Sequence, residues 1–348
     1  MTSTGAGNPA EAAALAEAIR QVRSSTSAAE LFGTVEPVRQ YRRLARLLHP
    51  DRVPAADRAY ATDAFVQLTT LWRSRGGVVI DTGDAEYRLS VRVHAGDLAD
   101  LYDVGAERFL KLPRQPANND LMEREARALR TLADRGDPRY LPYVPRLVDS
   151  FRHGDTATGA RRRVNVVAAA PGLHSLVEVR RAYPGGLDPR DAAWIWRRLL
   201  VVLGFTHRAG LVHGAVLPEH VLIEPAGHGV VLVDWCYSAA RDTASPVAGP
   251  LSAGDDLIPA IVPTYAGWYP AEVLDHMEPG PGTDIAMASR CMTWLMGYHA
   301  PQSLRRFATG CALPSLRQRP DDAWRLLDEL DELLERLFGP RTFRPFTL

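Results

Sequence analysis

The hydrophobic periodicity of the chain changes twice, and these changes limit the folds that it can adopt. In the first part of the chain, apolar residues recur every three or four positions, which predicts helices over about 10–24, 35–48 and 55–74. After the helix-breaking stretch SRGG at 74–77, short runs of β-branched and aromatic residues predict strands around one helix. From about residue 173 the pattern is mainly helical again. We therefore expect an α+β protein, in which a small all-α domain precedes a β-rich lobe and an α-rich lobe.

The same changes of pattern set the expected boundaries. Residues 1–9 are small and polar and indicate a loose tail, although Pro9 also suits the first turn of a helix. A helical domain is then expected over 10–76, a small lobe over 77–172 and a large lobe over 173–348. No internal repeat or low-complexity tract interrupts this order.

One helix is predicted inside the small lobe. The segment NNDLMEREARALRTLADRG has Asn119 or Asp120 in position to cap its start, and Gly136 lies near its end. The strand-like runs VVID, YRLSVRV, DLYDV and RFLKL precede this helix, and YVPRLVDSF and RVNVVAAA follow it. The predicted small lobe is therefore a sheet with one long helix.

Composition excludes several classes of protein. Among 348 residues, 41 acidic and 41 basic side chains give a formal net charge of zero, so global charge indicates neither nucleic-acid nor membrane binding. The three cysteines are scattered, which argues against a disulfide framework or a zinc site. The N-terminus lacks the pattern of a secretory signal, and the most apolar stretch, 194–205, is interrupted by Arg197 and Arg198. We expect a cytoplasmic protein with no membrane span.

Lys111 is the only lysine in the chain, so every other basic side chain among the 41 is an arginine. The arginine bias itself is typical of a GC-rich genome, and one lysine can persist on a surface by chance. The two cations differ physically, however, because an ammonium is a compact point charge and a guanidinium is a wide planar fork. A strand-like run precedes Lys111, and a helix with Glu125 follows, which favours a specific role for this ammonium.

The tripeptide His49-Pro50-Asp51 lies between two predicted helices. The helix before it places apolar residues on one face and four arginines largely on the other. A capped turn between two helices and a solvated basic face would explain the same residues. The four arginines are Arg39, Arg42, Arg43 and Arg46.

The segment YRRLARLLHPDR resembles the J-domain of the DnaJ-like co-chaperones. The resemblance implies that His49, Pro50, Asp51 and the basic face dock on a 70-kDa-class heat-shock chaperone and stimulate its ATP hydrolysis. A basic stripe would steer the domain onto an acidic partner surface. The segment before the basic helix is compressed relative to the family, and no fourth helix is evident before SRGG. The resemblance therefore implies a trimmed J-like domain.

From about residue 80 to 345 the chain resembles the protein kinases. Seven stretches follow one another in the order that the family shows, which is more specific than any one of them. They are RFLKL with Lys111, EREARAL with Glu125, the loop LVHGAVLPEHVLI, VVLVDWCYS with Asp234, GWYPAEVL with Glu272, GTDIAMASRCMTWLMG with Asp284, and LRQRPDDAW with Arg319.

The resemblance implies a site for ATP and Mg²⁺. Lys111 would pair with the phosphates, Glu125 would hold this lysine, and Asp234 would bind the metal. The phosphate loop of the family is degraded, because only Gly96 remains and Ala99 stands in the place of the last glycine. The adenine edge would lie near Ala168, Ala169 and Ala170.

The stretch that resembles the catalytic loop has lost its chemistry. His213 is kept, but Ala215 replaces the catalytic aspartate, and His220 replaces the asparagine that binds a second metal. A methyl group cannot accept a proton, and Mg²⁺ prefers oxygen ligands, so His220 is at best a poor metal ligand. The loss of both groups costs several orders of magnitude in rate. We expect a pseudokinase with no ordinary catalytic residue and only Glu219 as a surrogate.

Other matching residues are expected to be structural. His213 and Asp284 suit the packing of the large lobe, and Glu272 and Arg319 suit a buried ion pair. The tryptophans are expected in the core rather than around a ligand. They are Trp194, Trp196, Trp268 and Trp294.

Three functions are compatible with these patterns. The leading hypothesis is a co-chaperone adaptor, whose J-like domain recruits the heat-shock ATPase while the pseudokinase domain binds an unknown client or senses nucleotide. The alternative is a noncanonical ATP-dependent kinase, or a nucleotidyl or phosphoryl transferase, of the same fold. The pair Asp234-Trp235 also resembles aminoglycoside and choline phosphotransferases, although those families keep the loop aspartate.

Overall fold

The computed structural model divides the chain into two compact units. Unit 1 comprises residues 1–95 and 101–105, and unit 2 comprises 96–100 and 106–348. Each unit is considered by itself. The structure describes residues 9–33, 37–49, 53–54, 57–75, 79–89, 92–154, 159, 161–168, 172–241 and 256–348.

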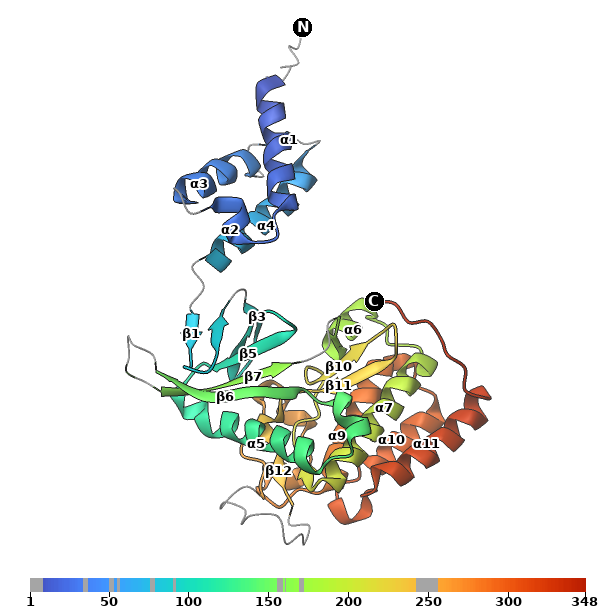
Figure 1. Cartoon of the computed structure of the whole chain (residues 1–348). Helices are drawn as coiled ribbons and strands as arrows, with labels where there is room; N and C mark the ends of the chain where they lie inside the picture. The colour runs from blue at the N-terminus through green and yellow to red at the C-terminus, as the bar shows by residue number, and fades with distance from the viewer. Residues whose placement is uncertain are drawn as a thin grey trace. The chain divides into compact units, whose positions relative to one another are not determined.

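Unit 1 contains four helices, which are α1 (Pro9–Ser24), α2 (Ala28–Phe32), α3 (Pro37–Leu48) and α4 (Arg58–Arg75) (Figure 1). Each helix contributes apolar side chains to one buried cluster, and α1 packs against both α3 and α4. The first helix therefore completes the helical bundle. The fully buried members of the cluster include Ala18, Val22, Leu44, Leu48, Ala61, Ala64 and Leu68.

Helix α2 was not predicted, although the sequence carries a start signal for it. The Ser27 hydroxyl accepts from the Glu30 N–H at 3.2 Å, and the Glu30 carboxylate accepts from the Thr26 N–H at 2.8 Å. This reciprocal capping gives a short helix its first turn. The predicted tail over 1–9 is one residue too long, because Pro9 is already helical, and residues 1–8 lie outside the described part of the chain.

Two strands of unit 1 form a hairpin. β1 (Val79–Asp81) pairs antiparallel with β2 (Glu86–Arg88), and β3 (Arg92–Ala95) follows. The run YRLSVRV, predicted as one strand, is therefore divided between β2 and β3. The boundary after Gly77 remains a prediction, because the compact units divide the chain within the strands instead.

The larger sheet has the strand order β3-β4-β5-β7-β6, and β4 (Ala99–Asp103) spans the division between the two units. The other strands are β5 (Arg108–Pro113), β6 (Arg146–Gly154) and β7 (Arg161–Ala168), and both β5 and β6 run antiparallel to β7. Helix α5 (Asn119–Arg135) packs against β6 and β7 (Figure 1).

The start of α5 differs from the prediction in its cap. A short 3₁₀ turn (Pro116–Asn118) leads directly into the helix, and Asn119 is its first residue rather than its cap. The Asn119 side chain instead bonds β7, because its Nδ2 donates to the Arg161 carbonyl at 2.9 Å and its Oδ1 accepts from the Arg163 N–H at 2.6 Å. Asn119 thus fastens the helix to the sheet.

The remainder of unit 2 is mainly helical, with short strands between the helices. β10 pairs antiparallel with β11 and with β8, and β9 pairs antiparallel with β12. The strands are β8 (His174–Ser175), β9 (Leu211–Val212), β10 (Val221–Glu224), β11 (Gly229–Leu232) and β12 (Ala239–Ala240). The helices are α6 (Leu176–Ala182), α7 (Pro189–Arg208), α8 (Ala271–Leu274), α9 (Pro281–Met296), α10 (Gln302–Cys311) and α11 (Ala323–Phe338).

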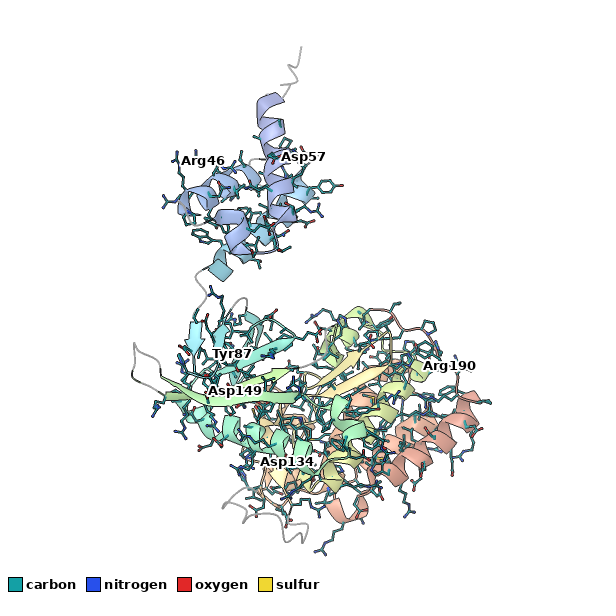
Figure 2. All side chains as sticks on the ribbon, in the orientation of Figure 1. Arg46, Asp57, Tyr87, Asp134, Asp149 and Arg190 are labelled. Atoms are coloured by element: carbon teal, nitrogen blue, oxygen red, sulfur yellow. The ribbon has the colours of Figure 1, made fainter. Side chains whose placement is uncertain are left out.

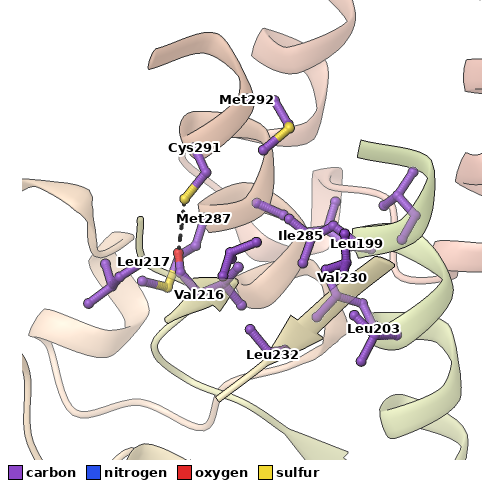
Figure 3. Packing of buried hydrophobic residues seen from close by; sticks show 14 of the residues in the cluster. Leu199, Leu203, Val216, Leu217, Val230, Leu232, Ile285, Met287, Cys291 and Met292 are labelled. Carbon is purple, nitrogen blue, oxygen red and sulfur yellow. Dashed lines mark hydrogen bonds between the residues drawn. The ribbon is translucent and has the colours of Figure 1, made fainter. Parts of the chain in front are cut away.

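The core of unit 2 lies around α7 and α9 (Figure 3). Leu199 and Leu203 from α7 and Ile285 from α9 are fully buried among strand residues. The Cys291 thiol on α9 donates to the Val216 carbonyl at 3.4 Å, which ties the helix to the loop after β9. Trp194 and Trp196 are buried in this core, whereas Trp268 and Trp294 are half-buried and contact each other edge to face.

The three cysteines, Cys236, Cys291 and Cys311, are free and buried. Burial raises the pKa of Cys311 to about 11, so this thiol is protonated near neutral pH. In the part of the chain that the structure describes, no helix is both long enough and apolar enough to cross a membrane.

Candidate nucleotide-binding site

Three elements of unit 2 bring Lys111, Glu125 and Asp234 together. Lys111 lies on β5, Glu125 on α5, and Asp234 follows β11. The ammonium Nζ donates to Glu125 Oε1 at 2.6 Å and to Asp234 Oδ1 at 3.0 Å. The exposed fractions of the three side chains are 13%, 2% and 18%, so the cluster is largely screened from solvent.

The charges in this cluster depend on one another. Burial alone would lower the pKa of Lys111, but the negative charges around it, with Asp234 first, raise that pKa well above its usual value. Burial would likewise raise the pKa of Asp234, but the charge of Lys111 outweighs it and leaves the pKa well below its usual value. The lysine is therefore a cation and Asp234 an anion at neutral pH.

A third potential ligand atom lies beside the ammonium. The Cys236 Sγ is 3.7 Å from Lys111 Nζ, and one ligand atom each of Glu125, Asp234 and Cys236 lies within 4.8 Å of the others. The ammonium contacts all three groups, so it occupies the position that a metal ion would need.

Sequence reasoning missed Asn165, which fixes Glu125 in place. Asn165 is fully buried on β7, and its Nδ2 donates to Glu125 Oε2 at 2.9 Å and to the Met122 carbonyl at 2.8 Å. Its Oδ1 accepts from the Ser150 hydroxyl at 2.7 Å. The sequence carried one signal for this role, which is the single polar residue inside the apolar run VNVVA. A buried amide needs hydrogen-bond partners, so Asn165 could be expected to bond another buried polar group.

Ala215, which the resemblance aligns with the catalytic aspartate, lies in the loop between β9 and β10. Ala215 is fully buried, and its carbonyl accepts from His220 Nδ1 at 2.8 Å. His220 Nε2 lies 3.4 Å from Asp234 Oδ2. His220 thus lies beside Asp234 at the position where the resemblance implies an asparagine, and its Nε2 faces the carboxylate.

His213 is a neutral scaffold residue. Its Nδ1 accepts from the Ala215 N–H at 3.2 Å, and its Nε2 donates to the Val233 carbonyl at 3.0 Å, so the ring needs one proton only. Burial lowers the pKa of His213 to about 4. The indole of Trp235 packs edge to face against this ring at 4.6 Å.

Asp284 at the start of α9 holds the loop backbone. Its Oδ2 accepts from the His213 N–H at 2.7 Å and its Oδ1 from the Gly214 N–H at 2.9 Å, while His207 Nε2 lies 2.9 Å from Oδ2. Gly214 has a φ of 77°, and a Cβ there would lie 2.5 Å from the Tyr237 carbonyl oxygen. This backbone conformation therefore favours glycine at position 214.

Glu272 and Arg319 form a buried ion pair. Arg319 Nη1 donates to Glu272 Oε1 at 2.5 Å and Nη2 donates to Oε2 at 3.1 Å. The arginine also donates to the Leu313 and Pro314 carbonyls at 2.5 and 2.9 Å. With side-chain exposures of 1% and 5%, this pair joins α8 to the segment before α11.

The turn after β3 is tied to the segment after β11 by a contact that the sequence did not predict. The Gly96 N–H donates to the Ala99 carbonyl at 3.1 Å, and Asp97 in this turn accepts from the Tyr237 hydroxyl at 2.5 Å. The Tyr237 ring also stacks against His220 at 6.0 Å. Burial raises the pKa of Tyr237, so the phenol is the donor. Gly96 and Asp97 therefore lie close to the Asp234 cluster.

Two other predicted positions, Glu219 and Ala168, lie within the described residues. Glu219 is exposed, and its carboxylate is hydrogen-bonded to the Tyr265 hydroxyl. Ala168 is the last residue of β7, where it is half-buried. Ala169 and Ala170, expected at the adenine edge, lie outside the described residues.

In unit 1, His49 follows the last residue of α3 and contacts the Phe65 ring edge to face at 5.7 Å. Pro50 and Asp51 lie outside the described residues. The four arginines of the basic face are exposed on α3, and Figure 2 labels Arg46 among them. Arg43 also donates to Gln21 Oε1 on α1 at 3.1 Å.

Comparisons with known proteins support the kinase-like part of this architecture. No protein-family model matches the chain. A curated yeast protein, casein kinase II subunit alpha' of Saccharomyces cerevisiae, is 24% identical over 190 residues, which are 53% of this chain and 52% of that protein. The chain thus matches about half the length of this relative.

Two solved structures show the same fold. Vaccinia related kinase 3 has a TM-score of 0.56 at 15% identity, over 78% of this chain and 95% of that structure. The PknI kinase domain of Mycobacterium tuberculosis has a TM-score of 0.50 at 15% identity, over 71% of this chain and 94% of that structure. These coverages include most of each kinase structure. The chain therefore contains a bilobal α+β fold of the protein-kinase-like type.

Proposed function

We propose that unit 2 binds ATP with Mg²⁺ and is a noncanonical ATP-dependent transferase with the kinase-like fold. The observation that carries the proposal is the position of Lys111, held between Glu125 and Asp234 at 2.6 and 3.0 Å. Charged groups with strongly shifted pKa values are typical of functional sites. Likeness to kinases in sequence and fold supports the same class of function.

The donor set fits a magnesium ion only at Asp234. Its carboxylate supplies the oxygen ligands that Mg²⁺ prefers, and phosphate oxygens of the nucleotide would complete the coordination. Lys111 would bind the phosphates as a point charge, and Glu125 keeps it oriented. Bound Mg²⁺ would neutralise phosphate charge. Imidazole suits other divalent metals better, so His220 is a weak second ligand for Mg²⁺.

The proposed activity differs from that of an ordinary kinase in its lack of a base. Ala215 offers no proton acceptor, and Glu219 is exposed and bonded to Tyr265 rather than to the Asp234 cluster. Lys111 and Asp234 would still position the nucleotide and stabilise its charge. These two effects account for most of the catalysis in phosphoryl transfer. Transfer should therefore be slower than in a complete kinase by several orders of magnitude.

The test is to incubate the full chain with Mg²⁺ and either γ-labelled or α-labelled ATP, with casein or the chain itself as acceptor. Label from γ-ATP indicates phosphoryl transfer, and label from α-ATP indicates nucleotidyl transfer. Asp234→Ala should abolish the label, whereas Glu219→Gln should leave it unchanged. Absence of transfer from both nucleotides would refute the transferase and leave a nucleotide-binding pseudokinase.

A second function is proposed for unit 1, which would dock on a 70-kDa-class heat-shock chaperone. Its support is the exposed arginine face of α3 and the position of His49 directly after that helix, next to the core that α3 and α4 share. In this case the whole chain would be a co-chaperone adaptor for a client that unit 2 binds. The resemblance in sequence is the basis of this second proposal.

The adaptor function is tested by adding the full chain to a heat-shock ATPase and measuring ATP turnover. Stimulation should disappear in His49→Gln. A matched control is His94→Gln, which changes an exposed histidine on β3 in the same unit. If the wild-type chain gives no stimulation at any ratio, or if His49→Gln stimulates fully, the adaptor proposal is wrong.

A further inference from the structure

The C-terminal segment of the chain folds back on unit 2 and encloses a cavity there. The Tyr183 hydroxyl donates to the Thr347 carbonyl at 2.7 Å, and His228 Nε2 donates to the Arg344 carbonyl at 2.9 Å. Phe346 is buried and stacks on the Tyr183 ring at 5.7 Å. These contacts hold residues 344–347 against the end of α6 and the β10–β11 turn.

The cavity formed in this way has a volume of about 200 Å³. Among the described residues that line it, none is acidic. This volume is below the roughly 300–1,000 Å³ of pockets for larger ligands, so the cavity suits a small group. The side chains relevant to ligand chemistry are Arg190, Arg197, Arg341, Arg344, Trp194 and His228.

Two of these arginines have carboxylate partners and two do not. Arg197 is paired with Asp331, and Arg344 lies 3.3 Å from Asp191 and 3.5 Å from Asp188. In contrast, no ion pair within the described part of the chain involves Arg190 or Arg341. Both are exposed at the rim, and Figure 2 labels Arg190. Arg190 also lies over the Phe338 ring at 5.2 Å, a contact that leaves its positive charge uncompensated.

A buried donor at the same cavity lacks an acceptor. Trp194 is 5% exposed, and its Nε1 has no hydrogen-bond partner. Its indole stacks on His228 at 4.2 Å, and the outer face of His228 stacks on Phe343 at 4.4 Å. Burial lowers the pKa of His228, and the positive charge of Arg341 acts in the same direction. The walls therefore offer donors and cations but no acidic acceptor.

We propose that this cavity binds a phosphate group, either as inorganic phosphate or as the head of a small phosphomonoester. Guanidinium groups bind phosphate oxygens through two parallel hydrogen bonds, which favours arginine over lysine at such sites. Arg190 and Arg341 would supply these bonds, and the stacked rings of Trp194 and His228 would form one wall of the site. The site is independent of Lys111 and Asp234, and its existence does not require transferase activity.

Isothermal titration calorimetry of the full chain with inorganic phosphate tests the proposal. Wild type should bind about one phosphate, and the double variant Arg190→Gln/Arg341→Gln should bind at least about tenfold more weakly, since two charge-assisted bonds are lost. Arg336→Gln is the matched control, because Arg336 is exposed on α11 and pairs with Glu332. Lys111→Met should bind phosphate as wild type does, which separates this site from the nucleotide site.

A parallel titration with glycerol 3-phosphate identifies the source of the phosphate group. Tighter binding of the ester than of inorganic phosphate would indicate a phosphomonoester ligand, and equal or weaker binding would indicate free phosphate. The His228 pKa, followed by NMR, should rise on saturation because a bound anion offsets the arginine charge. Lack of saturable binding, or equal binding by wild type and the double variant, would overturn the proposal.

Discussion

At Lys111 the size of the cation matters as well as its charge. One nitrogen atom contacts Glu125, Asp234 and Cys236 at 2.6, 3.0 and 3.7 Å. A guanidinium is a wide planar group that carries its donors on three nitrogens, so it does not fit the space that the compact ammonium fills among these groups. This gives a physical reason for a lysine at position 111 in a chain whose other basic residues are arginine.

Lys111→Arg should therefore weaken ATP binding by at least about tenfold even though the charge is kept, because a shifted cation loses its charge-assisted bonds. The measurement is the dissociation constant of Mg-ATP. Arg114→Lys, on the residue after β5 and paired with Asp100 at 3.1 Å, is the reverse exchange and should have little effect. Equal affinities of Lys111→Arg and wild type would contradict this explanation.

Asp97 places a negative charge close to the proposed nucleotide site around Lys111 and Asp234, through its 2.5 Å bond with Tyr237. Removing this charge in Asp97→Asn should strengthen Mg-ATP binding several-fold, because repulsion between the carboxylate and the phosphates is lost. Asp100→Asn removes a carboxylate from the neighbouring strand, where it pairs with Arg114, and serves as the control. Weaker binding by Asp97→Asn would show that the carboxylate supports the nucleotide site.

His213 should make stability depend on pH. Its folded-state pKa of about 4 lies below its ordinary value of 6.5, so between these values the unfolded chain takes up a proton that the folded chain does not. The stabilisation is fully present above pH 6.5 and is lost as pH falls toward 4, by up to about 3 kcal/mol. Denaturant unfolding at pH 7 and 4.5 should show a smaller loss for His213→Gln than for wild type. Equal losses would mean that His213 does not control this dependence.

At the scale of elements, the sequence predicted those that bury a regular apolar pattern. Helices α3, α4 and α5 and strands β5 and β7 lie where periodicity placed them. Short elements were less predictable. Helix α2 depends on a local capping box. Strands β2 and β3 are separate, although the sequence between Tyr87 and Val93 alternates as one strand would. The links between elements, such as Asn165 between β7 and α5, depend on three-dimensional proximity that periodicity does not encode.

The Glu272–Arg319 pair joins two such elements, and breaking one side of it should be costly. Arg319→Met leaves a buried carboxylate without its partner and should lower the free energy of unfolding by about 3–5 kcal/mol. Arg325→Met removes an arginine of α11 whose partner Glu329 is more than half exposed, and should have little effect. Urea denaturation measures both. Exposed ion pairs contribute up to about 1 kcal/mol. A loss within that range for Arg319→Met would show that the pair is not a structural link.

At the scale of the whole molecule, the order of the seven stretches was sufficient to predict the kinase-like fold. Lys111 lies on β5, Asp234 follows β11 and Asp284 lies in the first turn of α9, so their order along the chain reflects the topology. The chemistry was harder to predict, because it depends on a few side chains in one loop and on the contacts around them. Ala215 identified the missing base, but only the structure shows His220 beside Asp234. The J-like interpretation of unit 1 remains a prediction from sequence.

The central claim is that Lys111 and Asp234 form a site for Mg-ATP, and thermal unfolding of the full chain tests it most directly. With ATP at about 100 times its dissociation constant and Mg²⁺ in excess, the wild-type Tm should rise by roughly 5–10 °C. Mg²⁺ alone should have no effect, and Lys111→Met should show no rise with Mg-ATP. An unchanged wild-type Tm, or the same rise in Lys111→Met, would contradict the account.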